Sequence, residues 1–147
     1  MKKNYRNPLW IFIILGVGGL AVIALTWFFY LGVYLTIETL FYAENPLQVP
    51  VSQIRLGTAI GLSIAGYLVM RSKMTALFKA LLIMSPVSIV LVTLIFRIYA
   101  NPIALWITVI AYTGALIAGI RLAKLPWYFY VSVAFSVLIS TIYAWPR

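Results

Sequence analysis

Long apolar runs without charge, separated by short segments that hold the basic residues, dominate this chain. The first run, residues 9–37, would form a helix of about 43 Å, longer than the roughly 30 Å hydrocarbon core of a bilayer. Asn7-Pro8 and Asn101-Pro102 each precede a run and are typical of helix starts, because Asn caps free amides and proline needs no partner for its nitrogen. The pattern predicts an all-α integral membrane protein, one bundle of five transmembrane helices at about residues 9–31, 56–70, 80–97, 102–120 and 127–145.

Aromatic residues from Trp27 onward indicate where the first span leaves the acyl region, because amphipathic rings settle at the membrane interface. We therefore expect residues 36–43 to continue the helix along the interface. They belong to an outer segment, residues 35–55, in which Pro46 and Pro50 predict a bent, non-helical stretch. Such a stretch is either interfacial or re-entrant, and at membrane depth it needs cover from protein or water.

Basic residues are distributed unequally between the two predicted faces. An N-terminus in the cytoplasm places these basic residues inside: Lys2, Lys3, Arg6, Arg71, Lys73, Lys79, Arg121 and Lys124. The opposite face keeps Arg55, Arg97 and Arg147. Cytoplasmic loops carry an excess of Lys and Arg, so we expect the N-terminus in the cytoplasm and the C-terminus outside. Omitting the short second span would erase this asymmetry. We expect the first span to remain as an uncleaved anchor in the plasma (inner) membrane of a prokaryote.

Composition supports the membrane prediction and removes most chemistry. Of 147 residues, 65% are hydrophobic and 9% charged, which leaves too little polar surface for a soluble domain. The sequence contains no Cys, His or Asp, so disulfides, zinc sites, thiol nucleophiles and catalytic triads are excluded, and we expect no metal and no cofactor. The net charge of +9 does not predict nucleic-acid binding, because the basic residues lie between apolar runs instead of clustering on one face.

The only two carboxylates, Glu38 and Glu44, lie in the outer segment. A pair formed by Glu38 and Arg55 at the outer mouth is a candidate binding site for a cation or a zwitterion. In the alternative interpretation, both residues mark the interface and are solvated.

Small residues at helical spacing predict helix-packing faces. Gly57, Gly61 and Ala65 form a GxxxG-type ridge on the second span, which lets another backbone approach closely. Two further faces lie on the fourth span, at Thr108, Tyr112, Ala115 and Gly119, and on the fifth, at Ser132, Ser136 and Ser140. We expect these faces to pack inward, and the alternative is that they line a hydrated path.

Pro86 lies near the middle of the third span, between Ser85 and Ser88. Proline removes a backbone donor and frees the carbonyl of Leu82, so we expect a kink. The serines or neighbouring helices can then satisfy the freed backbone group.

The types of residue that the chain contains let us rank three classes of function: enzyme, transporter or channel, and non-catalytic subunit. We expect no enzyme activity, since no His activates the serines, and only a Glu38-dependent reaction at the outer interface survives as an enzyme alternative. Transport is a second alternative: an oligomeric transporter or channel for an apolar, lipid-like or small cationic substrate, without a charge at any span centre for proton coupling. The leading interpretation is a non-catalytic accessory or assembly subunit. Its partners are membrane lipids and other transmembrane helices, in a homo-oligomer or a larger complex.

Overall fold

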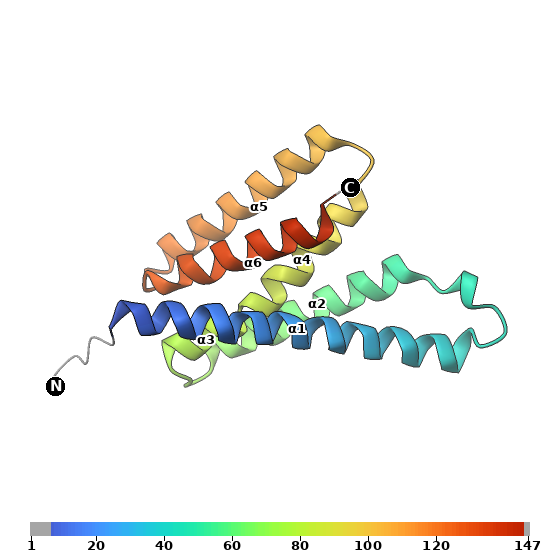
Figure 1. Cartoon of the computed structure of the whole chain (residues 1–147), viewed down its shortest axis with the longest axis horizontal. Coiled ribbons are helices and arrows are strands. Elements are labelled where there is room, and N and C mark those ends of the chain that lie inside the picture. The colour runs from blue at the N-terminus through green and yellow to red at the C-terminus, as the bar shows by residue number, and fades with distance from the viewer. Residues whose placement is uncertain (1–6, 146–147) are drawn as a thin grey trace.

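All regular secondary structure in residues 7–145, the part of the chain that the computed structural model describes, is helical (Figure 1). The elements are α1 (Pro8–Phe41), the short 3-10 helix η1 (Pro46–Gln48), α2 (Val51–Arg71), α3 (Ala76–Leu82), α4 (Met84–Ile98), α5 (Pro102–Leu122) and α6 (Tyr128–Ala144). Four stretches are long and apolar enough to cross a membrane: α1, α2, the stretch Ala76–Ile98 formed by α3 and α4, and α5. α6 is apolar but shorter, with 17 residues. The predicted all-helical membrane class is therefore confirmed.

Asn-Pro pairs begin two of the long helices. The side-chain oxygen of Asn7 accepts a hydrogen bond of 3.2 Å from the amide of Leu9. The side chain of Asn101 accepts two, from the amides of Ile103 and Ala104, both at 3.1 Å. Each Asn satisfies amides of the first turn, which have no partner within the helix. These starts follow from local sequence alone.

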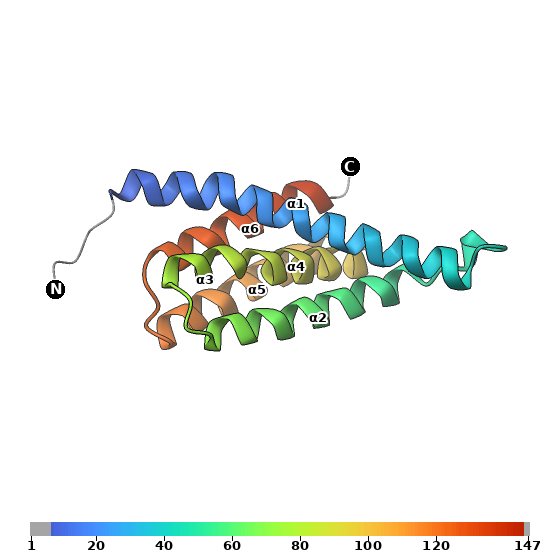
Figure 2. The ribbon, with the colours of Figure 1, turned by 90° about the horizontal axis from the view of Figure 1, so that it is seen from below.

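α1 and α2 are longer than the predicted spans. α1 continues without a break to Phe41, and its 34 residues make a helix of about 51 Å. α2 begins at Val51, directly after Pro50, five residues before the predicted start at residue 56. The polar residues Ser52 and Gln53 lower the hydropathy of this first turn. The pattern of apolar runs therefore did not indicate that the helix begins here. Figure 2 shows the consequence: the hairpin of α1 and α2 extends beyond the other helices at one end of the molecule.

α4 lies at the centre of the bundle, in contact with α1, α2, α5 and α6 (Figures 1 and 2). Its apolar side chains are the most completely buried in the described chain, including Ile89, Leu91 and Val92 at 0% exposure. The outer helices expose many large apolar residues, as expected for surfaces that face lipid. The core is therefore one central helix with its neighbours arranged around it.

The third span is interrupted next to Pro86. α3 ends at Leu82 and α4 begins at Met84, with Ile83 between them in a turn. Proline cannot donate the hydrogen bond that would continue the ladder to Leu82. The interruption at Ile83 lies three residues before Pro86, within the turn that this missing hydrogen bond would close. The proline therefore explains the interruption, as the sequence predicts.

Two glycines allow the residues around this interruption to pack closely. A Cβ added to Gly66 of α2 would lie 2.8 Å from Cγ of Pro86, and one added to Gly19 of α1 would lie 2.5 Å from Cε of Met84. A larger residue at Gly66 would push the rigid proline ring and α4 away, whereas one at Gly19 would require the flexible Met84 side chain to move. Gly19 and Gly66 were not among the predicted packing residues, because nothing local distinguishes them from the other glycines.

Candidate functional site

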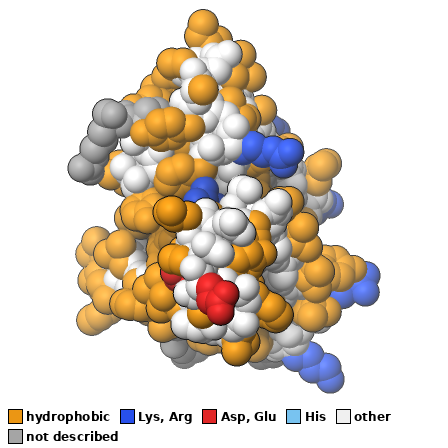
Figure 3. All heavy atoms as spheres, turned by 90° about the vertical axis from the view of Figure 1, so that its right-hand side faces the viewer, with side chains coloured by type: hydrophobic (Ala, Val, Ile, Leu, Met, Phe, Trp, Pro, Cys, Tyr) orange, Lys and Arg blue, Asp and Glu red, His pale blue; other side chains and the backbone are white. Residues whose placement is uncertain are grey.

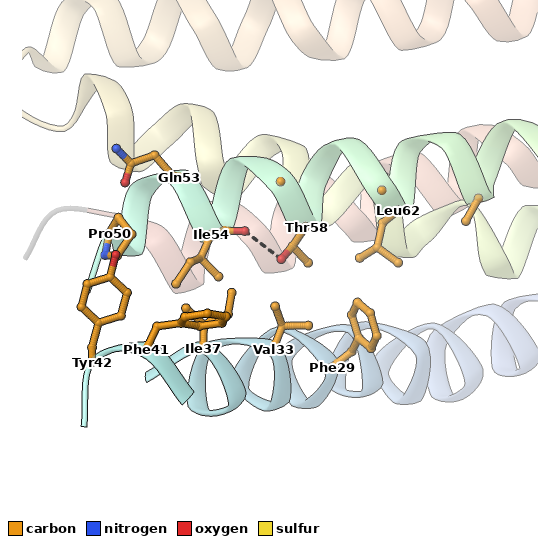
Figure 4. A pocket seen from close by; sticks show the side chains of 13 residues that line it. Phe29, Val33, Ile37, Phe41, Tyr42, Pro50, Gln53, Ile54, Thr58 and Leu62 are labelled. Carbon is orange, nitrogen blue, oxygen red and sulfur yellow. Dashed lines mark hydrogen bonds between the residues drawn. The ribbon is translucent and has the colours of Figure 1, made fainter. Parts of the chain in front are cut away.

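A groove of about 830 Å³ runs between α1 and α2, on the part of the hairpin where the two helices are joined (Figure 4). Apolar side chains supply most of its lining. It is lined by Phe29, Val33, Ile37, Phe41, Tyr42, Pro50, Gln53, Ile54, Gly57, Thr58, Gly61, Leu62 and Ala65. Its volume exceeds those of three other cavities in the described chain, which measure about 440, 400 and 390 Å³.

The α1 wall of the groove consists of Phe29, Val33, Ile37 and Phe41. They are spaced four residues apart, so their side chains lie one above another on one face of the helix. Figure 4 shows them directed toward α2. Phe29 and Phe41 are 55% and 74% exposed, so the described chain leaves more than half of each side chain uncovered. This row was not predicted, although the spacing of four residues in the sequence indicates a common helix face.

The α2 wall contains the predicted ridge of Gly57, Gly61 and Ala65. All three residues are exposed, and no other helix of the described chain lies within 4 Å of a Cβ built on either glycine. The hydroxyl of Thr58 donates a hydrogen bond of 2.8 Å to the carbonyl of Ile54 in its own helix, so this wall presents no free hydroxyl hydrogen. Packing of the ridge against a further helix stays a prediction, and the ridge is open to receive one.

The two residues of the candidate charged pair, Glu38 and Arg55, lie on α1 and α2. Arg55 lies over the ring of Phe96 on α4, with 4.3 Å between the guanidinium carbon and the ring centroid. Glu38 is half-buried on α1, and Glu44 lies in the loop that joins α1 to α2. Figure 3 views the molecule from this end and shows acidic side chains on a surface that is mainly hydrophobic. The arginine therefore has an aromatic partner on α4, and a Glu38–Arg55 binding site stays a prediction.

The predicted faces of the fourth and fifth spans have different environments. On α5, Tyr112 is half-buried and its hydroxyl donates to the carbonyl of Val87 at 3.2 Å, whereas Ala115 and Gly119 are exposed. The buried face of α5 instead carries Leu105, Val109 and Ile120. On α6, all three predicted serines are buried, with at most 1% exposure: Ser132, Ser136 and Ser140. Ser136 and Ser140 bond to α4, whereas the hydroxyl of Ser132 donates to the carbonyl of Tyr128 in its own helix at 3.1 Å.

Hydroxyl groups from several helices converge on residues 84–88 of α4. Thr26 of α1 donates to the hydroxyl of Ser85 at 2.7 Å, and the hydroxyls of Ser88 and Ser140 are 2.6 Å apart. Together with the Tyr112 bond, these contacts connect α1, α5 and α6 to the central helix beside Pro86. We call them the hydroxyl cluster. The serines of α6 are buried and their hydroxyls are bonded within the protein, as the predicted packing role requires.

The described residues contain no group of three or more His, Cys, Asp or Glu side chains that could hold a metal ion. No protein family model, curated protein or solved structure matches this chain. The groove between α1 and α2 is therefore the candidate site, and its chemistry is that of apolar contact.

Proposed function

We propose that this chain is a non-catalytic membrane component that binds a transmembrane helix of another protein in the groove between α1 and α2. One observation carries the proposal: Gly57, Gly61 and Ala65 form an exposed ridge along a wall of this groove, and a Cβ at either glycine would meet no other helix of the described chain within 4 Å. A small-residue ridge stabilises a membrane protein only when another backbone packs on it.

A helix fits the groove better than a disordered lipid chain. The ridge covers about 12 Å of α2, slightly more than two helical turns, and the facing row from Phe29 to Phe41 covers about 18 Å of α1. In a bilayer, association of helices depends on close van der Waals contact, because lipid is as apolar as the side chains it replaces. Glycines on one wall and phenylalanines on the other supply a surface with a defined shape for such contact.

The topology that we propose with this function has five spans. α3 and α4 count as one span, and α6, about 26 Å long, is the fifth. Trp127 precedes α6 and Trp145 follows it, which supports an interfacial location for both ends of this helix. The excess of basic residues at one end supports an N-terminus in the cytoplasm and a C-terminus outside. Lys2, Lys3, Arg6 and Arg147 contribute to that count and lie outside the described residues.

Crosslinking from the groove tests the proposed function. Because the chain has no Cys, Val33→Cys places a unique thiol on the α1 wall. We expect a photoactivatable, thiol-bound crosslinker at this position to join the chain to a distinct membrane protein in native membranes, and Gly61→Leu to abolish the product by filling the facing wall.

Gly32→Leu is the matched control, since Gly32 is an exposed glycine of the same hairpin that does not line the groove. It should leave the crosslink intact. If the chain crosslinks only to a second copy of itself, the groove binds that copy and the proposed partner is wrong. If it crosslinks only to lipid, and Gly61→Leu has no effect, the transporter alternative for lipid-like substrates is favoured.

A further inference from the structure

A second site lies on the opposite face of α2, where this helix packs on α4. The two helices are antiparallel neighbours: Gly66 meets Pro86 near one end of the pair, and Arg55 meets Phe96 near the other. Between these two contacts the helix surfaces do not close completely. Two adjacent cavities remain along the α2–α4 seam, and of their lining residues only Gln53 also lines the groove between α1 and α2.

The first cavity, of about 390 Å³, is polar and positively charged. Arg55 and Arg97 both line it, together with the hydroxyl-bearing Ser52 and Thr93 and the amide of Gln53. Neither of the two carboxylates of the chain lines it. The ring of Phe96 holds the Arg55 guanidinium at 4.3 Å, which restricts the position of this charge without neutralising it. This cavity therefore presents two cations and several hydrogen-bonding groups without an internal counter-ion.

The second cavity, of about 440 Å³, is apolar and continues from the first. Leu56 and Thr93 line both cavities, so a molecule can occupy them together. The apolar part is bordered by Ile60 and Ile64, which are 54% and 57% exposed, and therefore opens toward the surrounding lipid. A positively charged pocket at one end of an apolar groove matches a molecule with an anionic head and a hydrocarbon tail.

We propose that the α2–α4 seam is a binding site for one anionic phospholipid. Its phosphate lies between Arg55 and Arg97, because guanidinium groups bind phosphate oxygens through paired, charge-assisted hydrogen bonds. One of its acyl chains lies in the apolar cavity of the seam, past Leu56 and Ile60. Two positive charges select a headgroup with net negative charge over a zwitterionic one. The site shares only Gln53 with the proposed partner-binding groove, because its other lining residues on α2 lie on a different face of this helix.

Lipid titration of the full chain in detergent, followed by native mass spectrometry, tests this site. We expect phosphatidylglycerol to saturate one site per chain, and phosphatidylcholine with the same acyl chains to bind about tenfold more weakly, a difference of about 1.4 kcal/mol. Glycerol 3-phosphate, which has the phosphate but no chains, should not displace the lipid at equal concentration.

Two variants locate the site. Arg55→Gln with Arg97→Gln should reduce phosphatidylglycerol affinity about tenfold or more, because both phosphate ligands are lost. Its matched control is Arg71→Gln with Arg121→Gln, which also removes one arginine stacked on an aromatic ring, at 4.9 Å from Tyr67, and one in the last turn of a helix. The control should retain the site.

Ser63→Phe supplies an uncharged test, since Ser63 is an exposed residue that lines the apolar cavity. Filling this cavity should weaken the lipid without changing any charge. Equal binding of the two lipids, equal losses in the two double variants, or no effect of Ser63→Phe would overturn the proposal. Displacement of the lipid by glycerol 3-phosphate would assign the pocket to soluble phosphates and overturn it as well.

Discussion

Two glycines of α2, about two and a half helical turns apart, have opposite environments. Gly57 faces open space in the groove, whereas Gly66 faces Pro86 across the contact with α4. The same residue type therefore provides an exposed surface at one position and close helix packing at the other. Sequence spacing identified the ridge of Gly57 and Gly61, but the importance of Gly66 depends on which helix passes beside it, and that is a property of the tertiary structure.

This difference gives a matched pair of substitutions. Gly66→Ala should destabilise the protein by about 1–3 kcal/mol, because its new Cβ would lie 2.8 Å from the proline ring and force α2 away from α4. Gly57→Ala, in the same helix, should be neutral or stabilising by up to about 1 kcal/mol, because its Cβ meets nothing and alanine favours the helix. Unfolding in detergent, followed by circular dichroism, measures both. Equal effects of the two changes would show that the α2–α4 contact is looser than described.

The hydroxyl cluster yields a second prediction for single residues. The hydroxyls of Ser88 and Ser140 are 2.6 Å apart in a fully buried contact between α4 and α6. A double-mutant cycle with Ser88→Ala and Ser140→Ala should give a coupling of about 0.6 kcal/mol, the average for hydrogen bonds between membrane helices.

The control cycle combines Ser88→Ala with Thr113→Ala, because the Thr113 hydroxyl bonds to the carbonyl of Val109 in its own helix. Its coupling should be close to zero. If both cycles gave the same value, the Ser88–Ser140 contact would not contribute a specific interaction to the α4–α6 interface.

At the scale of elements, the helices were predictable where local signals determine them. Asn7 and Asn101 cap helices through bonds to residues two or three positions away, so the sequence alone contains the information. Pro86 likewise indicates its own interruption of the third span. The start of α2 was not predictable from hydropathy, because its first turn contains Ser52 and Gln53, whose side chains line a polar cavity instead of meeting lipid.

Which faces of the helices pack together was predictable only in part. On α6, the serines form the one regular row of hydroxyl groups on an apolar helix. Lipid cannot bond to these hydroxyls, so their burial away from lipid could be predicted from the sequence. On α5, several faces are equally apolar, and the structure buries Leu105 and Val109 while Ala115 and Gly119 stay exposed. The pairing of Arg55 with Phe96 also escaped the sequence analysis, because it joins positions 41 residues apart.

At the scale of the whole molecule, its unequal ends connect both proposals. The hairpin of α1 and α2 extends beyond the other helices at the end that holds both carboxylates, Arg55 and Arg97 (Figures 2 and 3). α2 contributes one face to the groove for a helix and the opposite face to the seam for a lipid. A lipid bound at the seam would therefore contact the helix that also forms the proposed partner-binding wall, without occupying the ridge of Gly57, Gly61 and Ala65.

The topology provides the last prediction, and single cysteines test it because the chain has none of its own. Five spans place Ala43 and Ala100 on the outer side and Thr75 and Ala123 on the inner side. All four residues are exposed, and none lies within a helix. A membrane-impermeant maleimide added to intact cells should therefore label Ala43→Cys and Ala100→Cys, and label Thr75→Cys and Ala123→Cys only after the membrane is opened.

A cysteine appended after Arg147 distinguishes five spans from four. If the 17 residues of α6 cross the membrane, this thiol reacts in intact cells together with Ala43→Cys. The expectation rests on the length of α6, about 26 Å, which is close to the thickness of the hydrocarbon core, and on the tryptophans that flank it. Reaction of the appended thiol only after permeabilisation, together with Thr75→Cys, would show that α6 does not span. Because α6 contributes two serines to the contacts with α4, it would then have to be covered within the membrane by a partner chain.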